Sequence, residues 1–114
     1  MVGGWEAAAG GGASELNDLS DAKTNSSGVT IGLGTEALHN DDGSANQNTA
    51  LGYQALRTTN SNSYNTAVGY RAGYALTGTG DVMYGRDSSL FGYNAGTALT
   101  TGRGNTAFGM SALD

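Results

Sequence analysis

The stretch Asn48–Leu56, "NTALGYQAL", occurs twice more in the same chain with little change. The copies are "NTAVGYRAG" at Asn65–Gly73 and "NTAFGMSAL" at Asn105–Leu113. Two weaker copies are "GVTIGLGTEAL" at Gly28–Leu38 and "SSLFGYNAG" at Ser88–Gly96. Because internal repetition on this scale is typical of repeat architectures, the repeat decides the fold.

The spacing of the repeats indicates the size of one structural unit. Glycines that follow an apolar residue are separated by steps of 20, 17, 23 and 17 residues: Gly32, Gly52, Gly69, Gly92 and Gly109. A base period of 17 is too short for a strand with a crossover helix, but it fits one coil of a β-solenoid. We therefore predict an all-β fold of parallel β-solenoid or β-roll-like repeats. Successive copies would stack about 4.8 Å apart in parallel register.

Each copy is expected to form a short strand with two unlike faces. A period of two places the bulkier residues on one face and smaller residues near the middle of the other. The faces are Thr49, Leu51, Tyr53 and Ala55, against Ala50, Gly52, Gln54 and Leu56. The small face suits close approach of another backbone layer. The pattern leaves open which face points inward.

The leading asparagines, Asn48, Asn65 and Asn105, have two compatible interpretations. In a stack they would form a ladder in which each side-chain amide bonds to the next one along. Alternatively, each asparagine turns the chain locally and tolerates a left-handed backbone.

Composition indicates that one chain is too thin to be stable alone. The 114 residues include 20 Gly, no Pro and no Cys, and the hydrophobic content is 38%. Small domains without disulfides or metals need oligomerisation, because a single small core seldom supplies more than about 3 to 5 kcal/mol. We expect a homotrimer whose shared core draws on the larger residues of the repeats. Those candidates are Leu51, Val68, Phe91 and Phe108, or the tyrosines Tyr53, Tyr70 and Tyr93.

The chain divides into two zones. Residues 1–25 are rich in small residues and are predicted to form an extended N-terminal anchoring arm, whereas residues 26–114 form the repeat shaft. Trp5, Leu16 and Leu19 are the expected contacts of the arm with partner proteins, since an otherwise polar arm needs a few apolar anchors.

The repeats resemble those of bacteriophage tail fibres and related virion fibre proteins, which string together copies of N-T-A-hydrophobic-G-Y-x-A-L. They are also similar to the head repeats of trimeric autotransporter adhesins. The stretch "ASELNDLSDA" resembles a segment found near the start of phage fibre chains. This resemblance covers about four fifths of the sequence and implies a homotrimeric fibre on a virus particle, anchored to other virion proteins by its N-terminal arm. Nothing here resembles a receptor-binding knob, a self-cleaving chaperone or the membrane barrel of the adhesins.

Residues that could carry chemistry are few. His39 is the only histidine, and "HNDDGSANQN" lacks the alternation of a calcium loop, so a solvated turn is expected. The G-x-G-x-x-A matches at Gly32 and Gly102 lack the strand and helix of a nucleotide site. The sequon at Asn25 lies in the arm. We predict no catalytic residue, no metal site and no cofactor, and hence no enzyme.

Two surface features leave glycan binding open. Arginines occur nearly once per coil, at Arg57, Arg71, Arg86 and Arg103, and could read acidic glycans or simply belong to a mixed, soluble surface. The tyrosine row could bind sugar rings or could serve packing.

The expected function is therefore a structural virion fibre, a tail fibre or similar, on the particle surface and contributing to host attachment. A capsid decoration or head-fibre protein and a carbohydrate-binding adhesin module, with a host surface glycan as its partner, are the alternatives. The net charge of -5 without a basic cluster disfavours nucleic acid. No apolar run is long enough for membrane insertion.

Overall fold

The computed structural model describes residues 18–24, 29–43, 46–78 and 84–114. The described chain is all-β, with six short strands in one sheet. They are β1 (Ala22–Thr24), β2 (Ile31–Leu33), β3 (Thr49–Leu51), β4 (Thr66–Val68), β5 (Ser89–Phe91) and β6 (Thr106–Phe108). The predicted fold class is confirmed: the chain winds into a β-solenoid of about four turns.

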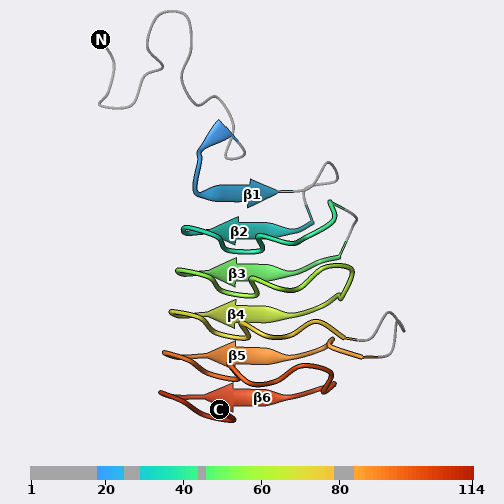
Figure 1. Cartoon of the computed structure of the whole chain (residues 1–114), viewed down its shortest axis with the longest axis vertical. Helices are drawn as coiled ribbons and strands as arrows, with labels where there is room; N and C mark the ends of the chain where they lie inside the picture. The colour runs from blue at the N-terminus through green and yellow to red at the C-terminus, as the bar shows by residue number, and fades with distance from the viewer. Residues whose placement is uncertain (1–17, 25–28, 44–45, 79–83) are drawn as a thin grey trace, which may run out of the picture.

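The strands stack in sequence order, as Figure 1 shows. The pairs from β2 to β6 are parallel, whereas β1 pairs with β2 antiparallel. The register aligns Ile31 with Thr49 and Thr49 with Thr66, so the first steps are 18 and 17 residues. The same register pairs Gly32 with Ala50. The glycine equivalent to Gly52 is thus Gly34, and the assignment of Gly32 to that position was wrong because "IGLG" offers two glycines.

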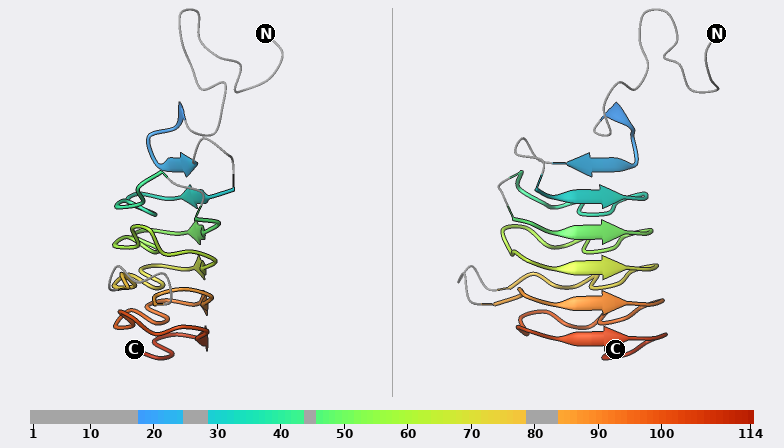
Figure 2. Two further views of the ribbon diagram at one scale, coloured as in Figure 1. Left: turned by 90° about the vertical axis from the view of Figure 1, so that its right-hand side faces the viewer. Right: turned by 180° about the vertical axis from the view of Figure 1, so that it is seen from behind.

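Each strand from β2 to β6 ends at a glycine that turns the chain. Gly52 has φ +128°, a conformation that side chains rarely adopt, and a Cβ there would lie 2.7 Å from the Gly69 carbonyl oxygen. The chain then returns through a turn behind the strand wall, which Figure 2 shows from two sides. The alternation by two therefore stops at Leu51. Ala55 is buried rather than sharing the outer face of Leu51, which differs from the sequence expectation.

The core lies between the strands and the returning turns. The middle residue of each strand points inward, so Ala50, Ala67 and Ala107 are buried while the outer residues of those strands are not. The largest buried side chains are leucines: Leu38, Leu56, Leu76 and Leu90. The small inner face predicted from the sequence lets the turn approach closely, and leucines from the turns supply most of the apolar volume.

The interior is packed differently around β5 than around the other strands. Leu90 holds the strand position that is alanine in β3, β4 and β6. Opposite it, Gly73 and Gly96 replace the leucine that Leu56 provides in an earlier coil. A Cβ on Gly73 would lie 2.8 Å from Leu90 Cδ1. The larger strand residue is therefore matched by smaller turn residues, as close packing requires.

The asparagines form a ladder, but its bonds differ from those expected. Asn48 Oδ1 accepts from the Asn65 backbone N–H at 2.9 Å, and Asn48 Nδ2 donates to the Asn62 carbonyl at 2.7 Å. Asn65 repeats both bonds, to the Ser88 N–H at 3.1 Å and the Gly85 carbonyl at 2.9 Å. Each side chain thus binds the backbone of the next coil and not the next amide side chain. Asn48 and Asn65 are fully buried.

The end of the predicted arm joins the stack. β1 lies within residues 1–25 and pairs Lys23 with Gly32. Leu19 is 43% exposed just before β1. Trp5 and Leu16, the other predicted anchors, lie outside the described residues.

Candidate interaction face

The outer face of the strand wall is built from in-register columns of side chains. The first outward residue of each rung is polar from β3 onward, and this column is Thr49, Thr66, Ser89 and Thr106. The second outward residue is apolar in every rung, and this column is Leu33, Leu51, Val68, Phe91 and Phe108. Parallel pairing without a slip places equivalent residues directly above one another, so the apolar side chains form a continuous row.

A second apolar column follows the glycine corner. It contains Tyr53, Tyr70, Tyr93 and Met110. We call the two apolar columns together the apolar stripe. Leu51 is 47% exposed, and Phe108 and Met110 are each 79% exposed. The structure therefore answers the question left open by the sequence: within a single chain the bulky face points outward.

The rings of the stripe are stacked on one another. Tyr53 and Tyr70 have centroids 5.2 Å apart, Tyr70 and Tyr93 are 5.0 Å apart, and both pairs are nearly parallel. Phe91 and Phe108 stack at 5.3 Å. Because sugars bind the faces of aromatic rings, and the faces within this row cover each other, only the ends of the row and the ring edges are open to a ligand.

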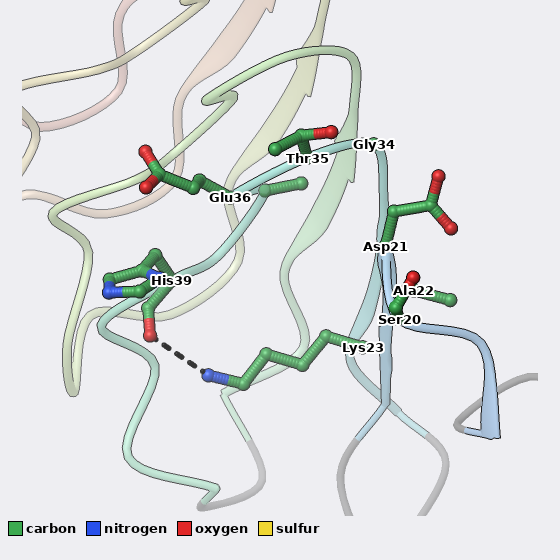
Figure 3. Close-up of a pocket in the computed structure, with 9 residues that line it drawn as sticks. Ser20, Asp21, Ala22, Lys23, Gly34, Thr35, Glu36 and His39 are labelled. Atoms are coloured by element: carbon green, nitrogen blue, oxygen red, sulfur yellow. Dashed lines mark hydrogen bonds between the residues drawn. The ribbon is translucent and has the colours of Figure 1, made fainter.

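A shallow hollow lies at the N-terminal end of the solenoid, between β1 and the first turn. Its volume is about 310 Å³, and Figure 3 shows the side chains that line it. Ser20 and Asp21 come from the β1 side, whereas Thr35, Glu36 and His39 come from the turn after β2. Lys23 crosses the hollow and donates to the Leu38, His39 and Asp41 carbonyls at 2.8, 3.3 and 3.0 Å.

The Glu36 carboxylate is held by the next coil. Arg57 Nε donates to Glu36 Oε2 at 2.7 Å and Gln54 Nε2 donates to the same oxygen at 2.6 Å. The hydrogen bond from Arg57 lowers the pKa of Glu36, and the bond from Gln54 lowers it further. The bond to Glu36 in turn raises the pKa of Arg57. The Glu36 carboxylate thus links the first coil to the second through these two hydrogen bonds.

The remaining chemical candidates are not assembled into a site. His39 is exposed in the turn after β2, as expected of a solvated turn. Across residues 18–24, 29–43, 46–78 and 84–114, no group of three or more His, Cys, Asp or Glu side chains could hold a metal ion. The match starting at Gly32 runs through β2 into its turn, and the match starting at Gly102 leads into β6. Asn25 lies outside the described residues.

The arginines do not form one column. Arg57 and Arg71 follow the glycine corner, where the Arg71 guanidinium lies 4.3 Å from the Tyr74 ring centroid. Arg86 and Arg103 precede the strands instead, and Arg103 Nε donates to Asp87 Oδ2 at 2.8 Å. A continuous arginine stripe is therefore absent from the part of the chain that the structure describes.

Sequence reasoning identified most of the apolar stripe but missed two members. Leu33 was missed because the first glycine was misaligned. Met110 was missed because it replaces the tyrosine of the other copies, although its position after Gly109 was a sufficient signal.

In the described segments no helix is long and apolar enough to cross a membrane. No known family model matches the chain, and the searches of curated proteins and of solved structures give no match either.

Proposed function

We propose that this chain is the shaft of a trimeric structural fibre on a bacteriophage particle, a tail fibre or similar, that contributes to host attachment. The resemblance of its repeats to those of phage fibres supports the virion role. The observation that carries the proposal is the apolar stripe on the outside of a single solenoid, of whose nine residues six are exposed and three half-buried.

The stripe supports association of identical chains. A continuous row of large apolar side chains on a soluble protein marks an interaction surface. Three parallel copies around an axis along the stack would bring each stripe to the centre, where a residue meets its own equivalents at the same height. The core of one coil is too thin to bury these residues itself.

Cysteine substitution tests the trimer directly, because the chain has no cysteine of its own. Leu51→Cys should cross-link to the same residue of a neighbouring copy under mild oxidation. Ala98→Cys, exposed on the returning side of the coil, is the matched control and should stay reduced. Light scattering should give three times the monomer mass. A stable monomer of 11.5 kDa would refute the proposal.

The virion attachment is tested separately. A truncation of residues 1–17 keeps β1 and should leave the oligomer intact while abolishing its incorporation into particles. Replacing Trp5, Leu16 and Leu19 by serine should have the same effect. Normal decoration of particles by both variants would contradict the anchoring role.

Two related functions are separated by direct observation. A head fibre or capsid decoration protein would share the apolar stripe, so labelled particles must be imaged to see whether the signal is on the tail or on the head. A glycan-binding role would use the exposed edges of the tyrosine row. It predicts that Tyr70→Ala loses binding on a glycan array while the protein remains folded.

A further inference from the structure

Among the described residues, β1 closes the N-terminal end of the stack, at the place where a preceding coil lies in the later repeats (Figure 1). In each later coil, the glycine that follows the strand donates its N–H to a carbonyl of the preceding coil, the one nearer the N-terminus. Gly52 donates to the Leu33 carbonyl at 2.8 Å, and Gly109 donates to the Phe91 carbonyl at 2.8 Å. In the first coil Gly34 donates instead to the Asp21 carbonyl at 2.7 Å. The Asp21 carbonyl, just before β1, thus accepts the hydrogen bond that a carbonyl of the preceding coil accepts in the later repeats.

Lys23 makes two further contacts that a preceding coil makes in the later repeats. Deeper in the stack the Arg57 carbonyl accepts from the Asn40 N–H at 3.1 Å, and the Leu76 carbonyl accepts from Thr59 Oγ1 at 2.8 Å. The equivalent carbonyls of the first coil belong to His39 and Asp41, and both accept from Lys23 Nζ. The ammonium group therefore supplies the donors that a preceding coil supplies to the later coils of the described stack.

The opposite end presents the complementary groups. Thr49 N–H donates to the Asn65 carbonyl and Ser89 N–H donates to the Asn105 carbonyl, each at 2.8 Å. Thr106 holds the same position in β6, so its N–H points away from β5. The Phe108 carbonyl likewise holds the position at which the Phe91 carbonyl accepts from the glycine of the next coil. Asn105 is only half-buried, whereas Asn48 and Asn65 are fully buried.

We propose that the β6 edge of one copy binds the β2 edge of a second copy when β1 is displaced, so that the parallel stack continues from chain to chain. The register repeats that inside the solenoid: Thr106 opposite Ile31 and Phe108 opposite Leu33. Thr106 N–H then donates to the Thr30 carbonyl, and Gly34 N–H moves from the Asp21 carbonyl to the Phe108 carbonyl. Because such head-to-tail contact does not close, it produces filaments.

The partner is a second copy because both edges carry the same pattern. Leu33 and Phe108 belong to one apolar column, so the apolar stripe would run unbroken across the junction. The antiparallel β1 strand cannot extend this pattern, and it therefore acts as a cap against end-to-end growth while it stays in place. This junction is independent of the lateral trimer and adds to it along the fibre axis.

The test releases the cap in the full chain. Lys23→Pro removes both the ammonium group and a backbone N–H of β1, whereas Lys23→Arg keeps a cation and is the matched control. We expect the wild type and Lys23→Arg to keep a constant mass over a hundredfold range of concentration in sedimentation experiments. Lys23→Pro should increase in mass several-fold and form rods in electron micrographs, in whole multiples of the single-stack length.

A second substitution shows whether the β6 edge forms the junction. Thr106→Pro removes an N–H that is not used within a single stack, and proline is tolerated on an edge strand whose N–H faces solvent. Thr106→Pro alone should fold like the wild type, and added to Lys23→Pro it should abolish growth. Growth that persists in the double variant would overturn the proposal.

Deletion of residues 1–24 provides an independent release of the cap should Lys23→Pro fail to fold. A folded deletion variant, checked by circular dichroism, should also grow, and Thr106→Pro should stop it. Absence of growth in a folded variant that lacks β1 would overturn the proposal. The lateral contact between chains of a trimer is followed separately, through the Leu51→Cys cross-link. Loss of the end-to-end junction is therefore distinguished from loss of the trimer.

Discussion

Single polar side chains hold neighbouring coils together in this molecule. The Asn65 amide satisfies the Ser88 N–H and the Gly85 carbonyl of the next coil from a fully buried position. Asn65→Ala would leave both backbone groups buried without a partner, at about 1 to 3 kcal/mol for each. We expect the free energy of unfolding in urea to fall by about 2 to 6 kcal/mol.

Asn105→Ala is the matched control for that change. Asn105 is half-buried in the last rung, and its side chain makes one long contact, from Nδ2 to Ser88 Oγ at 3.5 Å. Its replacement should cost less than about 1 kcal/mol. Equal losses for the two variants would show that the ladder bonds are not what stabilises the stack.

Glu36 makes the contact between the first two coils dependent on pH. Since the bonds from Arg57 and Gln54 lower its pKa in the folded state, this contact stabilises the fold above the ordinary pKa of the carboxyl group. The contribution is lost as the pH falls through the lowered folded-state value. A carboxyl NMR titration should show the lowered pKa, and Glu36→Gln should flatten the acid limb of the stability curve. An unshifted titration of Glu36 would contradict this.

At the level of the element, the loop between β4 and β5 absorbs the longest insertion in the repeat. The step from Thr66 to Ser89 is 23 residues, whereas the steps on either side are 17. Gly78 N lies 2.8 Å from where a Cβ on Gly85 would sit, so the two ends of the insertion are close together.

Excision of residues 79–84 should therefore leave the solenoid folded. The deletion removes the bond from Asn62 Nδ2 to the Tyr84 carbonyl at 2.7 Å, but it shortens a loop whose closure cost depends weakly on length. We expect the free energy of unfolding to change by no more than about 2 kcal/mol, with an unchanged far-ultraviolet spectrum. Loss of cooperative unfolding would show that the insertion is part of the fold. An insertion of six Gly/Ser residues in the same place is the companion control.

The strands were predictable from the sequence because the Asn-Thr-Ala-apolar-Gly pattern contains a β-favouring run and a glycine that ends it. Their order was predictable because consecutive repeats stack on one another. The turns were not. Glu36, Gln54, Arg71 and Asn94 share a left-handed backbone near φ +55°, with values of 58°, 56°, 54° and 55°. Glu, Gln and Arg usually avoid this region, whereas Asn enters it more often. Here hydrogen bonds to the preceding coil, such as that from the Gln54 N–H to the Thr35 carbonyl at 2.9 Å, compensate. β1 was also missed, since "AKT" carries no alternation of apolar residues.

For the whole molecule, the outward position of the apolar stripe should separate folding from the proposed assembly, because the buried leucine core lies within a single chain. Leu51 and Val68 lie on the outside of the coil, so replacing both by serine removes no core contact. We expect the double variant Leu51→Ser, Val68→Ser to keep its β-sheet spectrum and to lose its oligomeric mass. Its melting temperature should no longer depend on protein concentration.

The neighbouring polar column supplies the control for that experiment. Thr49→Ser with Thr66→Ser changes the same two strands outside the stripe and should leave both mass and melting temperature as in the wild type. A serine double variant at Leu51 and Val68 that still assembles would place the contact between chains on another face.

The apolar stripe was predictable only in part. Its residues follow from the repeat, but whether their side chains point outward or inward depends on where each strand ends.

The match between Leu90 and its glycine neighbours, Gly73 and Gly96, means that the coils are not interchangeable parts. Transplanting the β5 coil to follow a copy of the β3 coil would place a leucine against Leu90 where the native preceding coil has Gly73, and the interior would be overfilled. Copies that look alike along the sequence have thus become specialised to their positions. Lengthening such a protein by duplication would succeed only where adjacent coils are copied as a set.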